Sequence, residues 1–304
     1  MDAQTLVVML TVVAIATLLV LWQAIRKGVL RRLAVRDAVR RPSETTLVII
    51  GSLLGTAIVT GSFIVGDTLD SSIRATATTQ LGPVDEVIIV PSSDAAAEVT
   101  GAVEDLDDPR IDGTEAFLAV PASFSTGGSG EARAEPEAQA IEIDFDAARG
   151  FGGDARATGI IGDTPGAGEA AITEDIAATL NVTAGDHITG YLYAEKIDLE
   201  VTRVLPRLGL AGYWTGLEST SSNVFLEPGT IESLSRGRIP SGAEPPTTIV
   251  AVSNRGGVED GADLTGGVTT AIEDALPTDS RLRVEPIKKG RLDNAEAQGK
   301  QFSE

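Results

Sequence analysis

The stretch "TTLVIIGSLLGTAIVTGSFIVG", Thr45 to Gly66, decides how this chain is organised, because its 22 residues carry no charge. About 20 apolar residues are enough to cross the hydrocarbon core of a bilayer as a helix. The spacing of Gly51 and Gly55 would place both glycines on one face of that helix, where a second helix can approach closely. Glycine is common in membrane helices, so the motif alone is weak. We predict a transmembrane helix over 45–66, with helix packing at Gly51 and Gly55.

A second uncharged run, "AQTLVVMLTVVAIATLLVLWQAI", occupies residues 3–25. The alternative to a membrane helix is a cleaved signal peptide, which needs a basic start, a shorter apolar core and a small-residue cleavage site. Here the start carries Asp2 and no Lys or Arg, and the run ends in Trp22 and then Arg26. Tryptophan at the interface followed by arginine is typical of the end of a membrane helix. We therefore predict a first transmembrane helix over 1–25.

A strongly basic segment, residues 26–44, separates the two apolar runs. Its basic residues are Arg26, Lys27, Arg31, Arg32, Arg36, Arg40 and Arg41. Positively charged loops stay on the cytoplasmic side, so the N-terminus and residues 67–304 are predicted to lie outside a plasma (inner) membrane that the chain crosses more than once. The segment also reads as an amphipathic elbow helix that lies on the membrane and binds anionic lipids, with Pro42 ending it. The two interpretations are compatible.

The overall composition excludes several classes of function. The chain has 304 residues and a formal net charge of -20, and almost all of its acids follow Pro42. A domain of this charge repels nucleic-acid phosphates, so nucleic-acid binding is excluded. The chain has no cysteine, which excludes disulfides, thiolate catalysis and cysteine-ligated zinc.

The rest of the chain predicts a folded domain of helices and strands. A helix over 67–80 would continue the second membrane helix outward as a stalk. A short helix is predicted to start at Thr173, capped by its hydroxyl, and to end at Asn181. Alternation and apolar runs predict strands at 84–90, 113–125, 139–146, 187–193, 197–205, 223–228, 246–254 and 281–289, and helices at 94–106, 266–276 and 291–304.

These elements suggest how the exported part is built. Two α/β pieces, 84–125 and 246–289, flank a β-rich piece at about 135–230. The predicted fold class is therefore a membrane-anchored α+β protein. It has two N-terminal transmembrane helices and an extracytoplasmic domain over 84–290. In that domain a β-rich subdomain is inserted into an α/β subdomain, and stalk helices at 67–83 and 291–304 flank it.

No catalytic pattern is present in the sequence. It contains no phosphate-binding P-loop, no G-x-S-x-G and no H-E-x-x-H. A serine–histidine–aspartate triad would have to use His187, the chain's one histidine, and a surface or edge histidine is the better interpretation. The acidic pair Asp107-Asp108 lacks the spacing of an EF-hand and is better read as solvated surface. We expect no catalytic, cofactor-binding or metal-binding residue in this chain.

Three segments carry a resemblance to a known family: "LAVRDAVRRPSETTLVIIGSLLGTAIVTGSFIVGDTLDSSI" (33–73), "GEAAITEDIAATLNVTAGDHITGYL" (168–192) and "VEPIKKGRLDNAEAQGKQFSE" (284–304). They resemble the FtsX/MacB-like family of ABC transporter permeases. The first is similar to that family's basic step and following membrane helix, the second to a pattern in its extracytoplasmic domain, and the third to the approach to its next membrane helix. The resemblance implies an ABC ATPase as a separate partner that binds the ATP, a dimer of permeases, and an exported domain with α/β and β-rich subdomains.

The chain departs from the family pattern at both ends. The helix at 3–25 is extra to the simplest family plan, and that plan continues with three more membrane helices where this chain stops at Glu304. The resemblance thus implies the N-terminal part of a permease for export, lipoprotein or lipid handling, or mechanotransmission. The alternative is a membrane-anchored exported binding or scaffold protein. An anchored hydrolase is disfavoured because no nucleophile–base pair is visible.

Overall fold

The computed structural model describes residues 38–127, 132–213, 222–236, 239–243, 245–277 and 282–302, and also Leu18, Trp22, Gly28, Arg32 and Arg36. The chain divides into two compact units, residues 1–67 and 68–304. The predicted helix over 1–25 lies outside the described residues apart from two isolated positions, so it stays a prediction.

A single long helix, α3 (Pro42–Leu81, 40 residues), contains the second predicted membrane helix. It begins at Pro42, whose fixed φ and missing N–H suit the first helical position. The Thr45 N–H donates to the Arg41 carbonyl at 3.1 Å, and Arg41 pairs with Glu44 at 3.2 Å. By length and composition the part Pro42–Gly61 is able to cross a membrane, and its large apolar side chains are exposed. The described residues thus contain one candidate span.

The helix α3 does not stop at the end of its apolar part. It continues without interruption through residues 67–80, which confirms the prediction that this segment is helical. At about 1.5 Å per residue, its 40 residues correspond to roughly 60 Å. The helix ends at Gly82, which has a positive φ of 54° and donates its N–H to the Thr78 carbonyl at 2.9 Å.

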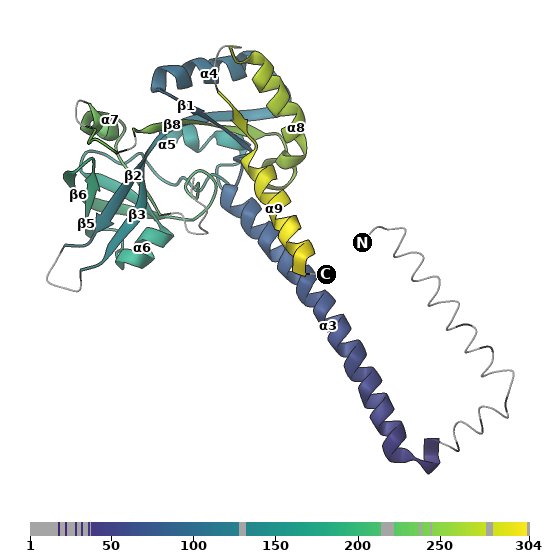
Figure 1. The fold of residues 1–304 in the computed structure, drawn as a ribbon. Helices are drawn as coiled ribbons and strands as arrows, with labels where there is room; N and C mark the ends of the chain where they lie inside the picture. Colours follow the sequence, from purple (N-terminus) through teal and green to yellow (C-terminus); the bar gives the residue numbers. More distant parts are fainter. Residues whose placement is uncertain are drawn as a thin grey trace. The chain divides into compact units, whose positions relative to one another are not determined.

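Nine strands among the described residues form one sheet. Their bounds are β1 (Glu86–Val90), β2 (Ile111–Ser125), β3 (Ala134–Glu142), β4 (Glu169–Thr173), β5 (His187–Leu192), β6 (Glu195–Leu205), β7 (Asn223–Phe225), β8 (Thr247–Asn254) and β9 (Val284–Glu285). Their order is β3-β7-β4-β6-β5-β2-β8-β1-β9, and β3 also pairs with β2. Figure 1 labels β1, β2, β3, β5, β6 and β8 of this sheet.

The extra pairing closes six of these strands into a small barrel. The second half of β2 pairs with β3 on one side and, over Ser123–Ser125, with β5 on the other. Side chains such as Phe124, Ile172 and Val224 fill the interior with alternating apolar residues. The helix α6 (Glu174–Leu180) adds Ile176 and Leu180 to the same core.

The first half of β2 belongs to an open sheet with β8, β1 and β9. Helices α4 (Ser93–Asp105) and α8 (Gly257–Ala275) cover one face, where Ile88, Val250 and Val252 meet Val99 and Ile272. The short α5 (Phe145–Ala148) and η1 (Phe151–Gly153) contribute Phe145 and Phe151 to the core on the opposite face. The predicted α/β and β-rich parts thus share one strand within one continuous sheet.

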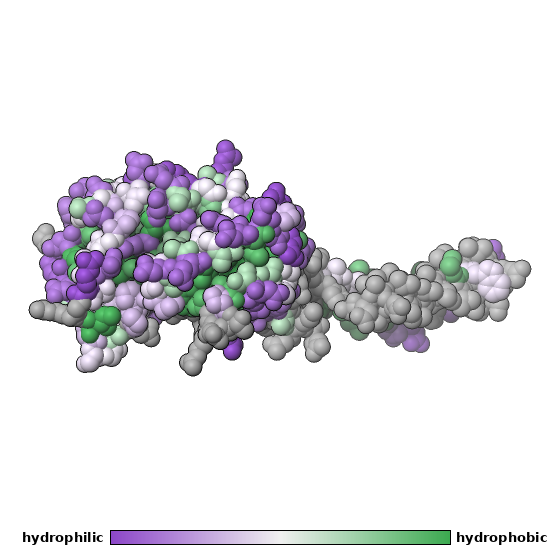
Figure 2. All heavy atoms as spheres, turned by 90° about the horizontal axis from the view of Figure 1, so that it is seen from above, coloured by the Kyte–Doolittle hydropathy of each residue, from purple (hydrophilic) through white to green (hydrophobic). Residues whose placement is uncertain are grey.

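The surface of the folded unit is largely hydrophilic on the face shown in Figure 2, where purple residues surround smaller apolar areas. This agrees with the acidic composition of the chain after Pro42. Such a surface is suited to water, because most of the apolar side chains of this unit are buried in its three cores.

Several predicted elements need correction. The strand predicted over 281–289 is reduced to β9, because Pro286 interrupts the ladder and α9 (Ile287–Phe302) begins directly after it. The strand predicted over 139–146 ends at Glu142, since the Asp144 carboxylate caps α5. The helix predicted over 266–276 begins already at Gly257. The sequence analysis missed α7 (Thr230–Ser235) and β4.

The cap predicted for α6 is also wrong in its chemistry. Thr173 is the residue before the helix, and Asn181 ends it with a left-handed φ of 54°, as expected. The Thr173 hydroxyl does not bond to the helix, however. It donates to the Asn223 carbonyl at 3.3 Å and accepts from the Asn223 N–H at 3.1 Å, which ties β4 to β7 inside the barrel.

Candidate functional site

The point where α3 enters the folded unit is tightly built. Leu81 and Val84 are fully buried, and the Val84 N–H donates to the Leu81 carbonyl at 3.0 Å. Gly82 lies between them, and a Cβ there would overlap the Ala157 carbonyl oxygen and lie 2.6 Å from Gly209 Cα. The turn from α3 into β1 is therefore short and pressed against two neighbouring loops.

A buried ion pair fixes the start of α9 beside this turn. Lys288 Nζ lies 2.8 Å from Asp85 Oδ1, and both side chains are fully buried. The Lys288 N–H donates to the Asp85 carbonyl at 3.2 Å, and its ammonium donates to the Gly257 carbonyl at 3.3 Å. Asp85 stands just before β1 and close after α3, so the ion pair joins the end of α3 to the start of α9.

Two further polar residues complete the junction. The Asn254 N–H donates to Asp85 Oδ2 at 2.8 Å, and its amide Nδ2 donates to Glu86 Oε1 at 2.8 Å. Burial raises the pKa of Glu86 to about 7, against the opposing effects of the nearby Asn254 and Thr265 side chains. Burial also raises the pKa of Asp85, although Lys288 acts in the other direction. We name Asp85, Glu86, Asn254 and Lys288 the junction cluster.

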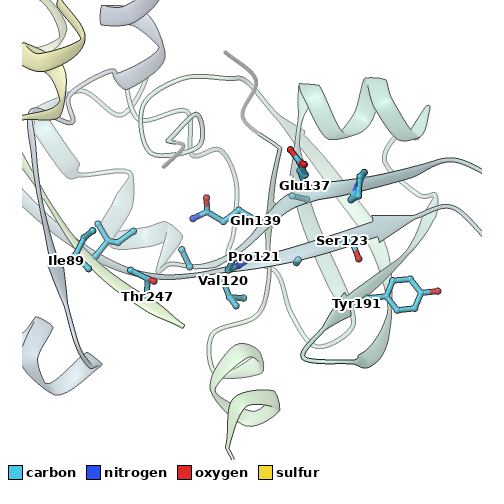
Figure 3. Close-up of a pocket in the computed structure, with 13 residues that line it drawn as sticks. Ile89, Val120, Pro121, Ser123, Glu137, Gln139, Tyr191 and Thr247 are labelled. Carbon is cyan, nitrogen blue, oxygen red and sulfur yellow. The ribbon is translucent and has the colours of Figure 1, made fainter. Parts of the chain in front are cut away.

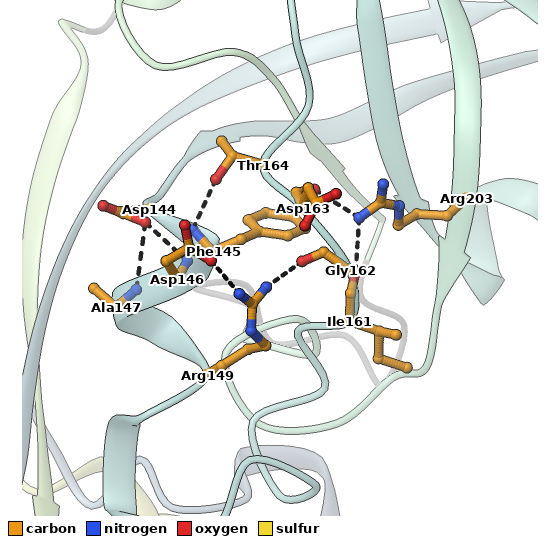
Figure 4. Close-up of polar contacts among 10 residues, drawn as sticks. All are labelled: Asp144, Phe145, Asp146, Ala147, Arg149, Ile161, Gly162, Asp163, Thr164 and Arg203. Carbon is orange, nitrogen blue, oxygen red and sulfur yellow. Dashed lines mark hydrogen bonds and ion pairs between the residues drawn. The ribbon is translucent and has the colours of Figure 1, made fainter.

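Two arginines, Arg149 and Arg203, hold the loop of residues 161–163 near the end of α3 (Figure 4). Arg203 on β6 donates to the carbonyls of Ile161 at 3.0 Å and Asp163 at 2.6 Å. Arg149, directly after α5, donates to the Gly162 carbonyl and pairs with Asp146. The same loop carries Ala157, whose carbonyl packs against Gly82. Arg203 therefore connects the barrel, and Arg149 connects α5, to the loop that contacts the end of α3.

The junction suits the transmission of movement. Close-packed interiors have low compressibility and transmit strain. The end of α3 and the start of α9 are both fixed within the interior of the folded unit, next to β1. A displacement of either helix end would therefore be felt by β1 and its neighbours β8 and β9.

A separate groove of about 630 Å³ runs along β2 (Figure 3). Along one side of β2, the pairing with β8 ends at Ala119 and the pairing with β5 starts at Ser123. On that side no described strand pairs with the β2 residues between these two positions. Pro121 lies in this gap, and proline, which has no N–H to donate to a further strand, is common at strand edges. Ile89 and Tyr191, each 45% exposed, line the groove.

The residues predicted for topology and packing lie in the first unit. Arg32, Arg36, Arg40 and Arg41 are exposed, and the ion pair of Arg41 with Glu44 is a surface pair. Arg26, Lys27 and Arg31 lie outside the described residues. Nothing described approaches within 4 Å of a Cβ added at Gly51 or Gly55, so that face of α3 is open. The topology and packing roles stay predictions.

The residues considered for catalysis remain apart. His187 is exposed at the start of β5. Asp108 bonds to Arg110, whose guanidinium lowers the pKa of that carboxyl to about 2. Within the described ranges no three acidic or histidine side chains are grouped to hold a metal ion. The expectation of no catalytic or metal-binding residue stays an expectation.

Sequence reasoning missed the junction cluster. The only local signal is the pair Asp85-Glu86, two acids at the start of a strand that otherwise reads as apolar. Lys288 fell in a predicted strand and looked like an ordinary surface residue, because lysine is almost never fully buried unless paired. The partnership across the chain appears only once β1, β8 and α9 are placed together.

Comparison with known proteins adds little to these residues. No family model matches the chain, and no curated protein matches it. Among solved structures, a domain of a protein assigned as a permease from Porphyromonas gingivalis is similar, at 10% identity and a TM-score of 0.35, over 68% of this chain and 90% of that one. At this TM-score the likeness carries no argument, so the functional argument rests on this chain's own residues.

Proposed function

We propose that this chain is the membrane subunit, or the front part of one, of an ABC transporter of the FtsX/MacB-like kind. In this proposal a separate ATPase hydrolyses ATP at the cytoplasmic face, and a second permease copy completes the dimer. Movement there passes along α3 to an extracytoplasmic domain, for export, lipoprotein or lipid handling, or mechanotransmission.

The observation that carries the proposal is the course of α3. Its first part is apolar, exposed and long enough to span a bilayer, and the same helix runs on to a buried end at Leu81. The junction cluster then fixes α9 beside that end. A plain anchor needs neither a helix continuous with the domain nor a second helix locked to its base. The three segments that resemble the permease family support the same conclusion.

Co-purification tests the proposed partner. The full-length protein that contains this chain, carrying an affinity tag, should retain a nucleotide-binding subunit when purified in mild detergent. The purified material should hydrolyse ATP, and a catalytic mutant of the ATPase should abolish that activity without releasing the subunit. If the full-length protein retains no ATPase subunit, the proposal loses its mechanism.

The orientation in the membrane gives a second test. Replacing Arg31, Arg32, Arg36, Arg40 and Arg41 with Gln should disturb insertion, because the positive charge that holds this segment in the cytoplasm is removed. Protease added outside intact cells or spheroplasts should then reach a smaller fraction of the 67–304 region. Replacing the exposed Arg133 and Arg156 with Gln is the matched control and should leave accessibility unchanged. Equal accessibility of all three proteins would contradict the topology role.

The groove along β2 favours a second candidate, a membrane-anchored exported binding protein. Its volume of about 630 Å³ lies within the usual range of small-molecule sites, and Ile89 and Tyr191 offer apolar surface. The two candidates differ in their need for an ATPase. A binding protein of this kind would keep its full activity in cells that lack every candidate ATPase partner.

A further inference from the structure

The junction cluster contains more acid than base. Asp85, Glu86 and Lys288 are all fully buried, so two carboxyl groups share one ammonium among the described side chains of the cluster. The negative charge of Asp112 also acts on Asp85 and raises the pKa of Asp85 further. With every group ionised, the cluster would hold an uncompensated negative charge away from water, which is strongly unfavourable.

The polar contacts of the cluster show that Glu86 has fewer partners than Asp85. Asp85 forms an ion pair with the Lys288 ammonium through Oδ1 and accepts a hydrogen bond from the Asn254 N–H on Oδ2, both at 2.8 Å. Glu86 receives the Asn254 amide on Oε1, while Oε2 has no donor among the described residues. The Asn254 amide oxygen likewise has no donor there. A proton on Glu86 would turn one unpaired acceptor into a hydrogen-bond donor and remove the negative charge of that carboxyl group.

The charges around the cluster also favour a proton on Glu86. Three charged groups act on the two carboxyls: Lys288 on α9 acts on both, Asp85 just before β1 acts on Glu86, and Asp112 on β2 acts on Asp85. The other elements packed here contribute neutral groups, Asn254 from β8 and Thr265 from α8. Burial, the largest cause, raises the pKa of Glu86 to about 7.

We propose that the junction cluster is a buried proton-binding site that controls how firmly the start of α9 is held against β1. With a proton on Glu86 the cluster is neutral and closed. Loss of that proton leaves a buried negative charge, which draws water in and loosens the contacts of Lys288 with Asp85. The inference does not depend on an ATPase partner, and it concerns reversible protonation alone.

The sign of the pH effect follows from the raised pKa. The closed cluster binds its proton more tightly than an opened, hydrated cluster does, so closure is favoured at low pH and is lost as pH rises toward about 7. Over this window the opening constant rises by up to about tenfold per pH unit, and it levels off above the raised pKa.

Hydrogen exchange measured by mass spectrometry tests the proposal on the full chain in lipid nanodiscs. After correction for intrinsic rates, amide protection in residues 284–292 should fall by up to about tenfold per unit between pH 5 and 7 and then level off. Amides of β5 and β6 in the barrel should not follow this trend. The variant Glu86→Gln, which is neutral at every pH, should keep segment 284–292 protected at pH 8.

Glu115→Gln is the matched control. Glu115 is also buried, with its pKa raised to about 7 by burial and by Asp144, but it lies on β2 outside the junction cluster. This variant should keep the pH dependence of segment 284–292. Protection of wild-type 284–292 that does not change between pH 5 and 8 overturns the proposal, and this result needs no variant. A pH dependence retained in Glu86→Gln, or lost only in Glu115→Gln, overturns it as well.

Discussion

Replacing Lys288 with Met lowers the free energy of unfolding of the folded unit by about 3–5 kcal/mol, the cost of breaking a buried ion pair from one side. Asp85 is fully buried, and it would be left with the Asn254 N–H and without a counter-charge. The loss should shrink at acid pH, because a protonated Asp85 carries no charge to compensate. Urea unfolding of the full chain in detergent, followed by circular dichroism at pH 5 and pH 8, measures both effects.

Two further variants give this prediction a sharp control. Lys289→Met removes the neighbouring lysine, whose ion pair with Asp293 spans 3.5 Å on the surface with both side chains more than half exposed. Exposed pairs of this kind contribute at most about 1 kcal/mol. The double variant Asp85→Asn/Lys288→Met should recover part of the loss, because no buried charge remains. Equal losses for Lys288→Met and Lys289→Met would contradict the role of the buried pair.

Gly82→Ala should destabilise the folded unit by about 2–5 kcal/mol, since two costs act together. A left-handed φ of 54° is unfavourable by about 1–2 kcal/mol for a residue with a side chain. The added Cβ would also overlap the Ala157 carbonyl and approach Gly209 Cα to 2.6 Å, and both obstacles are backbone atoms. Overpacking of this kind typically costs another 1–3 kcal/mol or so. Thermal unfolding of the full chain measures the sum.

Gly168→Ala separates these two costs. Gly168 has a φ of 77°, so it bears the same backbone penalty, but nothing lies within 4 Å of its added Cβ. This variant should lose only about 1–2 kcal/mol. A loss at Gly82 no larger than that at Gly168 would show that the base of α3 has room to relax, and the tight entry of the helix would no longer hold.

The elements that could be predicted from sequence are those whose signal is local. The continuous apolar run Ile249–Val252 predicts β8 because the strand is buried on both faces. The uncharged run Thr45–Gly66 predicts the apolar part of α3. Local patterns cannot show that β2 pairs with β3, β5 and β8 in turn, and so the closed barrel was not foreseen.

The missed start of α8 has an instructive physical cause. Glycine costs about 1 kcal/mol in a helix relative to alanine, so the glycine-rich segment from Gly257 argued against a helix. In the fold, a Cβ on Gly261 would lie 2.7 Å from Asp85 Oδ2. The glycine that weakens the helical signal is therefore the residue that lets α8 approach the junction cluster. Here a tertiary requirement overrides propensity, and a single sequence does not reveal it.

The strand β2 passes from the open sheet into the barrel without a break, and this has a consequence for how the domain comes apart. The barrel and the open sheet both depend on β2, because each loses a hydrogen-bonded strand when β2 unfolds. The barrel and the open sheet should therefore melt together, in one cooperative transition seen equally by probes placed in either. The whole domain is then the smallest unit that folds independently. A barrel excised at the ends of β2 would not fold by itself.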